Sequence, residues 1–207
     1  MKRGKFITFE GIDGAGKSTH LAWSTDYLRG QGVGLIVSRE PGGTVLGEQL
    51  RQISLAEDQR IHPETEALMM FTSRRQHLED VIRPALHRGD WVLCDRFTDA
   101  SFAYQGGGRG VAKDKLEALE RWVHPDLQPD LTLLFDVSAE LGQSRVARIK
   151  SPDRFEREDV GFFRRVRDAY LDRLRQWPNR MVRFDGSKPI ADIQQEIGQR
   201  LPAIWKK

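Results

Sequence analysis

Residues 6–19 read FITFEGIDGAGKST, a short apolar run that passes directly into a glycine-rich loop. The loop contains the complete pattern G-x-x-x-x-G-K-S at Gly11–Ser18. Its glycines allow consecutive backbone N–H groups to face one concavity, Lys17 adds a positive charge, and Ser18 adds a hydroxyl suited to Mg²⁺. A helix that begins at Lys17 would point its N-terminus at the same anion. The stretch therefore predicts a strand, a loop that cradles the phosphates of a nucleotide, and a helix.

The composition is that of a compact globular chain. Its 207 residues are 39% hydrophobic and 30% charged, and no apolar run approaches the 18 residues that a membrane span needs. We expect one α/β domain over residues 1–207, with no membrane partner and a cytoplasmic location, because Met1–Gly4 leads into a strand rather than into a signal-peptide core. A single cysteine and five scattered histidines predict neither a disulfide nor a zinc site.

Positive charge is concentrated in one segment. The chain has a net charge of +3, and residues 141–175 alone carry ten basic residues against six acidic ones. Such a segment could form a face that binds duplex nucleic acid, or an arginine-bearing flap that closes over a polyphosphate. We favour the flap, so the sequence predicts no nucleic-acid partner.

Short apolar segments alternate with helical patterns along the whole chain. Expected strands lie at 5–10, 33–38, 91–95, 131–136 and 181–185, and expected helices include 112–123 and 138–149. Near-continuous apolar strands that alternate with helices are typical of a parallel sheet covered on both faces. The predicted fold class is α/β with a five-stranded parallel sheet.

Polar residues follow the second and third expected strands. Arg39–Thr44 forms a turn after the second strand, and Asp95-Arg96-Phe97 ends the third, so both should lie at the edge where open α/β sheets bind ligands. An apolar strand that ends in an aspartate is where P-loop enzymes place a carboxylate for Mg²⁺. Four glycines within residues 106–110 predict a flexible loop.

A long helix after Pro63 carries an unusual inward stripe, which reads Leu68, Phe71, Arg75, Leu78 and Ile82. The arginine could be a snorkelling side chain or part of a buried ion pair. Alternatively, the ring at 71 and the guanidinium at 75 contact one ligand, since they lie one turn apart. Pro84 should kink or end this helix.

Together these motifs resemble bacterial thymidylate kinase in order and spacing over essentially the whole chain. The segments that carry the resemblance are the P-loop, Arg39–Thr44, Phe71 with Arg75, Asp95–Phe97, Tyr104–Arg109 and Asp153–Glu156. The resemblance implies a P-loop nucleoside-monophosphate-kinase fold with a short arginine-rich lid at about 145–157. It also implies transfer of the ATP γ-phosphoryl group to dTMP in dTTP biosynthesis, with Mg²⁺, by a homodimer.

The resemblance assigns roles to individual residues. For ATP it implies Gly11, Ile12, Asp13, Gly14, Ala15, Gly16, Lys17, Ser18, Thr19, Arg145, Ser187 and Lys188, and for Mg²⁺ Ser18 and Asp95. For dTMP it implies Asp13, Arg39, Glu40, Pro41, Arg51, Phe71, Arg75, Arg96, Ser101, Tyr104 and Gln105. In this assignment Phe71 stacks on thymine, Arg75 donates to its O4, Tyr104 crowds the 2′ position, and three arginines (39, 51 and 96) hold the acceptor phosphate. A pocket for the thymine methyl group discriminates by only about 1–3 kcal/mol, so some dUMP turnover is expected.

Catalysis of phosphoryl transfer depends on positioning and on cationic groups near the transferred oxygens. The resemblance implies Lys17, Asp95, Arg96, Arg148 and Arg154 as the catalytic set. Some thymidylate kinases carry an arginine inside the P-loop, at the position that is Gly14 here. The lid should then supply that arginine, either Arg154 or Arg148, with Arg145 as a helper.

Three other functions are compatible with parts of this sequence pattern. One is another small P-loop kinase that acts on a different nucleotide or nucleoside. A second is a P-loop switch or a nucleic-acid-dependent ATPase, although the chain has no N-K-x-D motif and neither Asp95 nor Asp136 precedes a glutamate. A third is a noncatalytic nucleotide-binding module, which would not need lid arginines.

Overall fold

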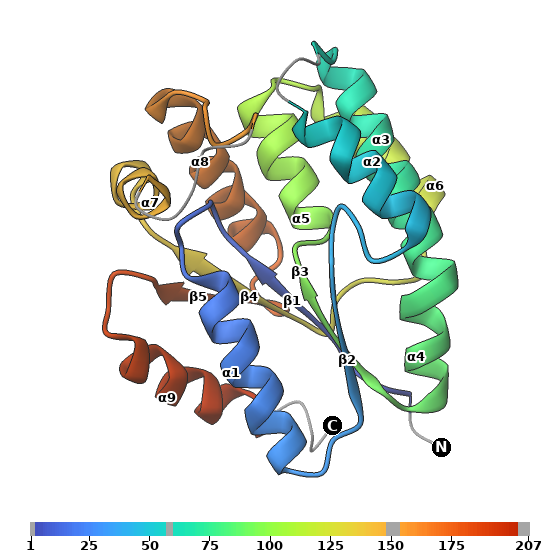
Figure 1. Ribbon diagram of the computed structural model, residues 1–207, viewed down its shortest axis with the longest axis vertical. Coiled ribbons are helices and arrows are strands. Elements are labelled where there is room, and N and C mark those ends of the chain that lie inside the picture. Colours follow the sequence, from blue (N-terminus) through green and yellow to red (C-terminus); the bar gives the residue numbers. More distant parts are fainter. Residues whose placement is uncertain (1–2, 57–59, 148–153, 203–207) are drawn as a thin grey trace.

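The computed structural model describes residues 3–56, 60–147 and 154–202. A parallel five-stranded sheet in the order β2-β3-β1-β4-β5 forms its centre (Figure 1). The strands are β1 (Phe6–Glu10), β2 (Leu35–Arg39), β3 (Trp91–Asp95), β4 (Leu131–Asp136) and β5 (Met181–Asp185). The predicted fold class is confirmed, and three of the five strands have the predicted bounds.

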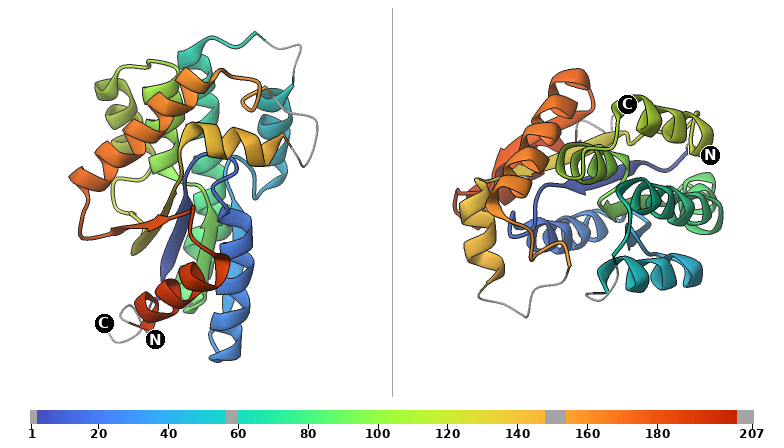
Figure 2. Two further views of the ribbon diagram at one scale, coloured as in Figure 1. Left: turned by 90° about the vertical axis from the view of Figure 1, so that its left-hand side faces the viewer. Right: turned by 90° about the horizontal axis from the view of Figure 1, so that it is seen from above.

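Burial of the strands follows their place in the sheet. Every residue of β1 and β4 is buried, whereas the edge strand β2 has only half-buried and exposed residues and the edge strand β5 has two buried residues, Met181 and Phe184. Helices cover both faces, with α1 on one side and α5 and α8 on the other (Figure 2). Near-continuous apolar sequence in the central strands is therefore the consequence of two covered faces.

The helices fill the connections between strands, in the order that the sequence pattern predicts. They are α1 (Lys17–Gly30), α2 (Val45–Leu55), α3 (Pro63–His77), η1 (Leu78–Ile82), α4 (Arg83–Arg88), α5 (Thr98–Ser101), η2 (Phe102–Gly108), α6 (Lys113–Val123), α7 (Ala139–Val146), α8 (Val160–Gln176) and α9 (Ile190–Arg200). None of the helices within the described ranges is long and apolar enough to cross a membrane.

Pro84 does not end the long helix that follows Pro63. Helix α3 passes through a π-helical turn, η1, into α4, whose first turn contains the proline. A proline removes one backbone donor and clashes with the carbonyl of the preceding turn, and a π turn relieves both by widening the helix. The rod therefore continues to Arg88.

The glycine-rich stretch after Tyr104 is helical, so the prediction of a flexible loop was wrong. Gly106–Gly108 completes η2, which packs on α8. A Cβ at Gly107 would lie 2.6 Å from the Ala169 Cβ, and one at Gly108 would lie 2.5 Å from the Phe162 ring. These glycines allow two helices to approach closely.

All five strands end at one edge of the sheet because all five run parallel. The P-loop follows β1, Glu40 follows β2, Arg96 follows β3 and Gly186 follows β5. The fold thus gathers the predicted site segments from distant parts of the sequence at a single edge.

Candidate active site

The loop between β1 and α1 has the conformation that the glycine pattern predicts. Gly14 and Gly16 have φ values of 78° and 94°, in the left-handed region that side chains disfavour. Lys17 is only 7% exposed, and its Nζ donates to the carbonyls of Gly11 and Ile12 at 3.0 Å each. The chain thus holds an ammonium group within a curled, amide-rich loop.

This loop borders a cavity of about 780 Å³, which we call the P-loop cavity. The predicted residues that line it are Asp13, Gly14, Ala15, Gly16, Lys17, Ser18, Thr19, Arg39, Glu40, Arg51, Asp95, Arg96, Arg145 and Lys188. Ser187 lies outside this lining on an exposed turn, where its N–H and hydroxyl donate to Asp185 Oδ1 at 2.9 and 2.6 Å. The sequence did not predict His20, Gly186, Ile190 and Ile193, which complete the lining.

Two oxygen-bearing side chains in the P-loop cavity suit a hard cation. Asp95 Oδ1 is buried and has no hydrogen-bond partner among the residues that the structure describes. The hydroxyl residue Ser18 lines the same cavity. Because an unpaired buried carboxylate oxygen is costly and Mg²⁺ prefers oxygen ligands, this donor set fits the predicted metal.

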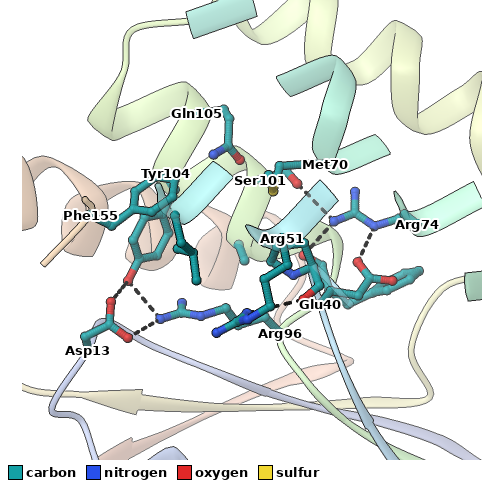
Figure 3. Close-up of a pocket in the computed structure, with 14 residues that line it drawn as sticks. Asp13, Glu40, Arg51, Met70, Arg74, Arg96, Ser101, Tyr104, Gln105 and Phe155 are labelled. Carbon is teal, nitrogen blue, oxygen red and sulfur yellow. Dashed lines mark hydrogen bonds and ion pairs between the residues drawn. The ribbon is translucent and has the colours of Figure 1, made fainter. Parts of the chain in front are cut away.

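A second cavity, which we call the side pocket, has a volume of about 90 Å³ and is shown with its lining residues in Figure 3. It is lined by Asp13, Glu40, Pro41, Arg51, Leu55, Met70, Arg74, Arg96, Phe97, Ala100, Ser101, Tyr104, Gln105 and Phe155. Four of these residues also line the P-loop cavity: Asp13, Glu40, Arg51 and Arg96. The two cavities therefore meet at a charged boundary.

Arg74 on α3 is the most buried cation of the side pocket, with 2% of its surface exposed. Its Nε donates to Glu40 Oε2 at 2.7 Å, and its Nη2 donates to the carbonyl of Phe97 at 3.1 Å and to Ser101 Oγ at 2.9 Å. Within the described ranges, Nη1 has no partner although it is buried. A fixed guanidinium with one free donor is suited to bind an acceptor atom of a ligand.

Phe71 and Arg75, which were predicted to contact the base, do not line this pocket. Phe71 is 1% exposed and packs in the core under the Arg74 guanidinium, whose Cζ lies 4.6 Å from the ring centroid. Arg75 is 54% exposed, donates to the carbonyl of Val123 at 3.1 Å and pairs with Glu79. The face of α3 that lines the pocket is one residue earlier in register, at Met70 and Arg74.

Asp13, Arg96 and Tyr104 form a closed set of contacts between the two cavities (Figure 3). Arg96 Nη2 donates to Asp13 Oδ1 at 2.7 Å and to the Tyr104 hydroxyl at 2.9 Å, and that hydroxyl donates to Asp13 Oδ2 at 3.0 Å. Burial acts to raise the pKa of Asp13, but the charges of Arg96 and Lys17 outweigh it and hold that pKa at about 2. Asp13 is therefore a carboxylate at neutral pH.

The position of Arg96 depends on an unusual backbone conformation. Its φ is 67°, the only positive value for a residue other than glycine among the described residues. The next residue, Phe97, donates its N–H to Glu10 Oε1 at 2.7 Å, and Tyr170 donates to Glu10 Oε2 at 2.8 Å. Burial, and then the charge of Asp99, raise the pKa of Glu10 to about 8. A buried acid thus supports the strained turn that directs Arg96 into the site.

The other residues predicted to bind the acceptor nucleotide differ in how firmly their side chains are held. Glu40 is 4% exposed between Arg74 and His77, whereas Arg39 is 55% exposed and pairs with Glu48 at 2.8 Å. Arg51 donates to the carbonyl of Pro41 at 3.2 Å. Glu40 is thus fixed, and Arg39 lies at the entrance.

The lid arginines occupy different places. Arg154 does not line the P-loop cavity, since its Nε donates to the carbonyl of Ser54 at 2.7 Å and its Nη2 to Glu66 Oε2 at 2.5 Å. Arg145 does line it, and its Nη1 donates to the carbonyls of Gly14 and Gly186 at 3.2 and 3.0 Å. The predicted position of Arg154 over the phosphates is not found, and residue 148 lies outside the described ranges.

The predicted site residues omit six that line the side pocket, and they omit Glu66, which lies behind Gln105. The six are Leu55, Met70, Arg74, Phe97, Ala100 and Phe155. Arg74 had a signal, because Met70 and Arg74 are one turn apart just as Phe71 and Arg75 are. Two adjacent arginines satisfy the same pattern, and only packing distinguishes them. Phe155 lies in the segment Asp153–Glu156 that carries the resemblance, but no role was assigned to it, and Glu66 had no local signal that could separate it from a surface residue.

Comparison with known proteins agrees with this geometry. The family model described as thymidylate kinase matches residues 9–197. The chain is 57% identical to the thymidylate kinase of Nitrosomonas europaea, over 99% of this chain and 95% of that protein. It is also 57% identical to the thymidylate kinase of Cupriavidus taiwanensis, over 98% and 100% of the two chains. The crystal structure of thymidylate kinase from Ehrlichia chaffeensis superposes with a TM-score of 0.80 at 33% identity, over 97% of this chain and 99% of that one.

Proposed function

Because this chain belongs to the thymidylate kinase family, we propose that its P-loop cavity binds ATP and its side pocket binds dTMP. The chain is an ATP:dTMP phosphotransferase that forms dTDP and ADP. The observation that carries the placement is the shared boundary of the two cavities, where Asp13, Arg51 and Arg96 face both. A phosphoryl group that passes between two nucleotides must cross such a boundary.

For the donor nucleotide we propose that Gly11–Thr19 holds the phosphates of ATP and that Lys17 bridges the outer two. Arg145 and the 186–188 turn would lie along the rest of the nucleotide, since Arg145 donates to the carbonyl of Gly186. Ser18 and Asp95 would hold Mg²⁺, because they supply oxygen atoms in the same cavity. Bound there, the metal would offset negative charge on the phosphates during transfer.

For the acceptor base we propose that Arg74, rather than Arg75, donates to thymine O4. The support is the free Nη1 of Arg74, a buried donor that a carbonyl oxygen would satisfy. Met70 takes the place at the pocket that Phe71 was expected to fill, and Ser101 and Gln105 border the same space. The Tyr104 ring would crowd the sugar 2′ position, held by its bonds to Asp13 and Arg96.

For the acceptor phosphate we propose Arg39, Arg51 and Arg96, three cations at the entrance and boundary of the P-loop cavity. Arg96 is fixed on the loop carbonyl of Gly11 at 2.9 Å, so it needs no reorganisation during transfer. Arg154 can act on the transferred group only if it leaves Glu66. We therefore propose that Arg96 and Lys17 are the main cations that stabilise the negative charge of the transition state. A role for Arg148 stays a prediction.

We further propose a homodimer in the cytoplasm, with each chain a single domain whose lid spans about 145–157. Large apolar side chains are exposed on three neighbouring helices: Val45 on α2 is 81% exposed, Leu68 on α3 is 51% exposed, and Trp122 on α6 is 80% exposed. A second copy of the chain would cover them. Light scattering coupled to gel filtration tests this, with Trp122→Lys expected to shift the mass toward the monomer.

The function is tested by ADP release with ATP and Mg²⁺ over dTMP, dUMP, UMP, CMP, AMP and GMP, and with DNA alone. We expect dTMP to give the highest kcat/KM and dUMP a lower but measurable value, because one methyl group discriminates weakly. Turnover that requires DNA, or equal turnover of all monophosphates, would contradict the assignment.

A further inference from the structure

Glu66 is a fully buried carboxylate behind the side pocket, although it lies in the first turn of α3. Its Oε1 accepts a hydrogen bond from Gln105 Nε2 at 2.8 Å. Its Oε2 accepts from Arg154 Nη2 at 2.5 Å and lies 3.4 Å from Arg109 Nε. A carboxylate placed between two guanidinium groups can only accept hydrogen bonds.

This arrangement fixes the direction of the Gln105 amide. Because Glu66 presents only acceptor atoms, the amide nitrogen of Gln105 must face it, and the carbonyl Oε1 must take the other side of the planar group. No residue in the described part of the chain donates a hydrogen bond to that Oε1. Gln105 is 3% exposed and lines the side pocket, into which its amide end points (Figure 3). The pocket is thus given a hydrogen-bond acceptor.

The lining of the side pocket therefore includes one buried donor without a partner among the described residues and one acceptor, both near the space for a base. Arg74 Nη1 is the donor, and Gln105 Oε1 is the acceptor. The imide edge of thymine or uracil offers the complement, with O4 as an acceptor and N3–H as a donor. Cytosine offers the reverse at both positions, with an amino group at C4 and a bare N3, so each position would be left unpaired.

We propose that Glu66 is a positioning residue that sets the polarity of Gln105 and so makes the pocket select an imide base over cytosine. The proposal rests on the acceptor site assigned above. The same carboxylate anchors the lid segment, because Arg154 is bound to Glu66 while its neighbour Phe155 forms part of the pocket wall. The Glu66 carboxylate thus both holds Arg154 of the lid segment and orients the amide that selects the base.

Replacement of this carboxylate by an amide tests the proposal. In Glu66→Gln, Arg154 donates a hydrogen bond to the carbonyl oxygen of the new side chain, so the amide nitrogen of that side chain faces Gln105. Gln105 must then turn its own carbonyl toward position 66 and present its amino group to the pocket. We expect the ratio of kcat/KM for dTMP to that for dCMP to fall at least about tenfold, mainly through loss of dTMP turnover.

The double variant Glu66→Gln/Gln105→Glu supplies the rescue. Its residue 105 carries a carboxylate that accepts from the amide at 66 and still presents an oxygen to the pocket, so the ratio should return to within about threefold of the wild-type value. Glu64→Gln is the matched control, because Glu64 is exposed on the same helix and pairs with Lys115. It should leave the ratio unchanged.

Thermal unfolding of each variant is measured first, and if Glu66→Gln does not fold, the double variant alone decides the question. A Glu66→Gln ratio within twofold of wild type, or a folded double variant that fails to select dTMP, would overturn the role of Glu66. Neither result would contradict the proposal that the wild-type protein phosphorylates dTMP. Absence of wild-type turnover with dTMP would instead contradict the proposed function.

Discussion

Gly14 is the P-loop position at which substitution should be most informative. Its φ is 78°, and a Cβ there would lie 2.2 Å from the carbonyl oxygen of Gly142 on α7. A Cβ at Gly142 would in turn lie 2.7 Å from the carbonyl oxygen of Asp13. The P-loop and the base of the lid therefore touch backbone to backbone, so an arginine at position 14 has no room in this chain.

The cost of Gly14→Ala can be divided into two parts. Left-handed backbone costs a residue with a Cβ about 1–2 kcal/mol. Separation of α7 from the loop to make room for the methyl group adds about 1–3 kcal/mol, as overpacking does elsewhere. A total of about 3 kcal/mol should lower the Tm by about 6–12 °C in a domain of this size.

Gly110→Ala is the matched control for this substitution. Gly110 has a φ of 77°, and a Cβ there would meet nothing within 4 Å, so it carries only the backbone strain. Its Tm should fall by only about 2–8 °C, and by less than that of Gly14→Ala. Gly14→Ala should also raise the KM for ATP, because it disturbs the carbonyl that Arg145 contacts. Calorimetry and ADP release measure both effects, and equal Tm losses with an unchanged KM would refute the reasoning.

Three further substitutions address the supporting residues. The folded state should hold a proton on Glu10 up to a pH of about 8, whereas the unfolded chain releases it near 4.5, so the free energy of unfolding falls between these values as pH rises. Glu10→Gln should flatten that fall, by an amount on the order of a few kcal/mol, in urea unfolding at pH 5 and 8; an unaltered slope would count against the raised pKa. Asp95→Asn should raise the Mg²⁺ concentration for half-maximal activity at least about tenfold, and an unshifted Mg²⁺ titration would remove Asp95 from the metal site. Arg145→Ala should raise the KM for ATP severalfold while the KM for dTMP stays constant, and a change confined to dTMP would contradict its place on the donor side.

The sequence predicted those features of the fold that depend on local pattern. The central strands were found because burial on both faces makes them continuously apolar, and the loop at Gly11–Ser18 because its glycines occupy fixed positions. The π turn before Pro84 and the packing of Gly107 on α8 were missed. Both depend on neighbours that are distant in sequence, which no local pattern encodes.

The candidate site was predicted to the level of segments rather than of side chains. Arg74 and Arg75 are adjacent, so helical periodicity allowed either one to face the pocket, and the partners that select Arg74 come from two other segments, at Glu40 and Ser101. Arg154 was expected near the phosphates because the P-loop has Gly14 where some relatives have an arginine, so the resemblance implied that the lid supplies one. Its partner, Glu66, is 88 residues away in sequence and gave no signal of its own.

The central claim is that Arg74 donates a hydrogen bond to the base of the acceptor nucleotide. It is tested most directly by the pair Arg74→Lys and Arg75→Lys. Each variant keeps its charge and loses the guanidinium fork, but only Arg74 has a buried free donor in the pocket. We predict that Arg74→Lys lowers kcat/KM for dTMP by about 10–100-fold, the value of a hydrogen bond to a charged donor, and that Arg75→Lys stays within about threefold of wild type. A loss of dTMP turnover in Arg75→Lys with wild-type turnover in Arg74→Lys would contradict the account.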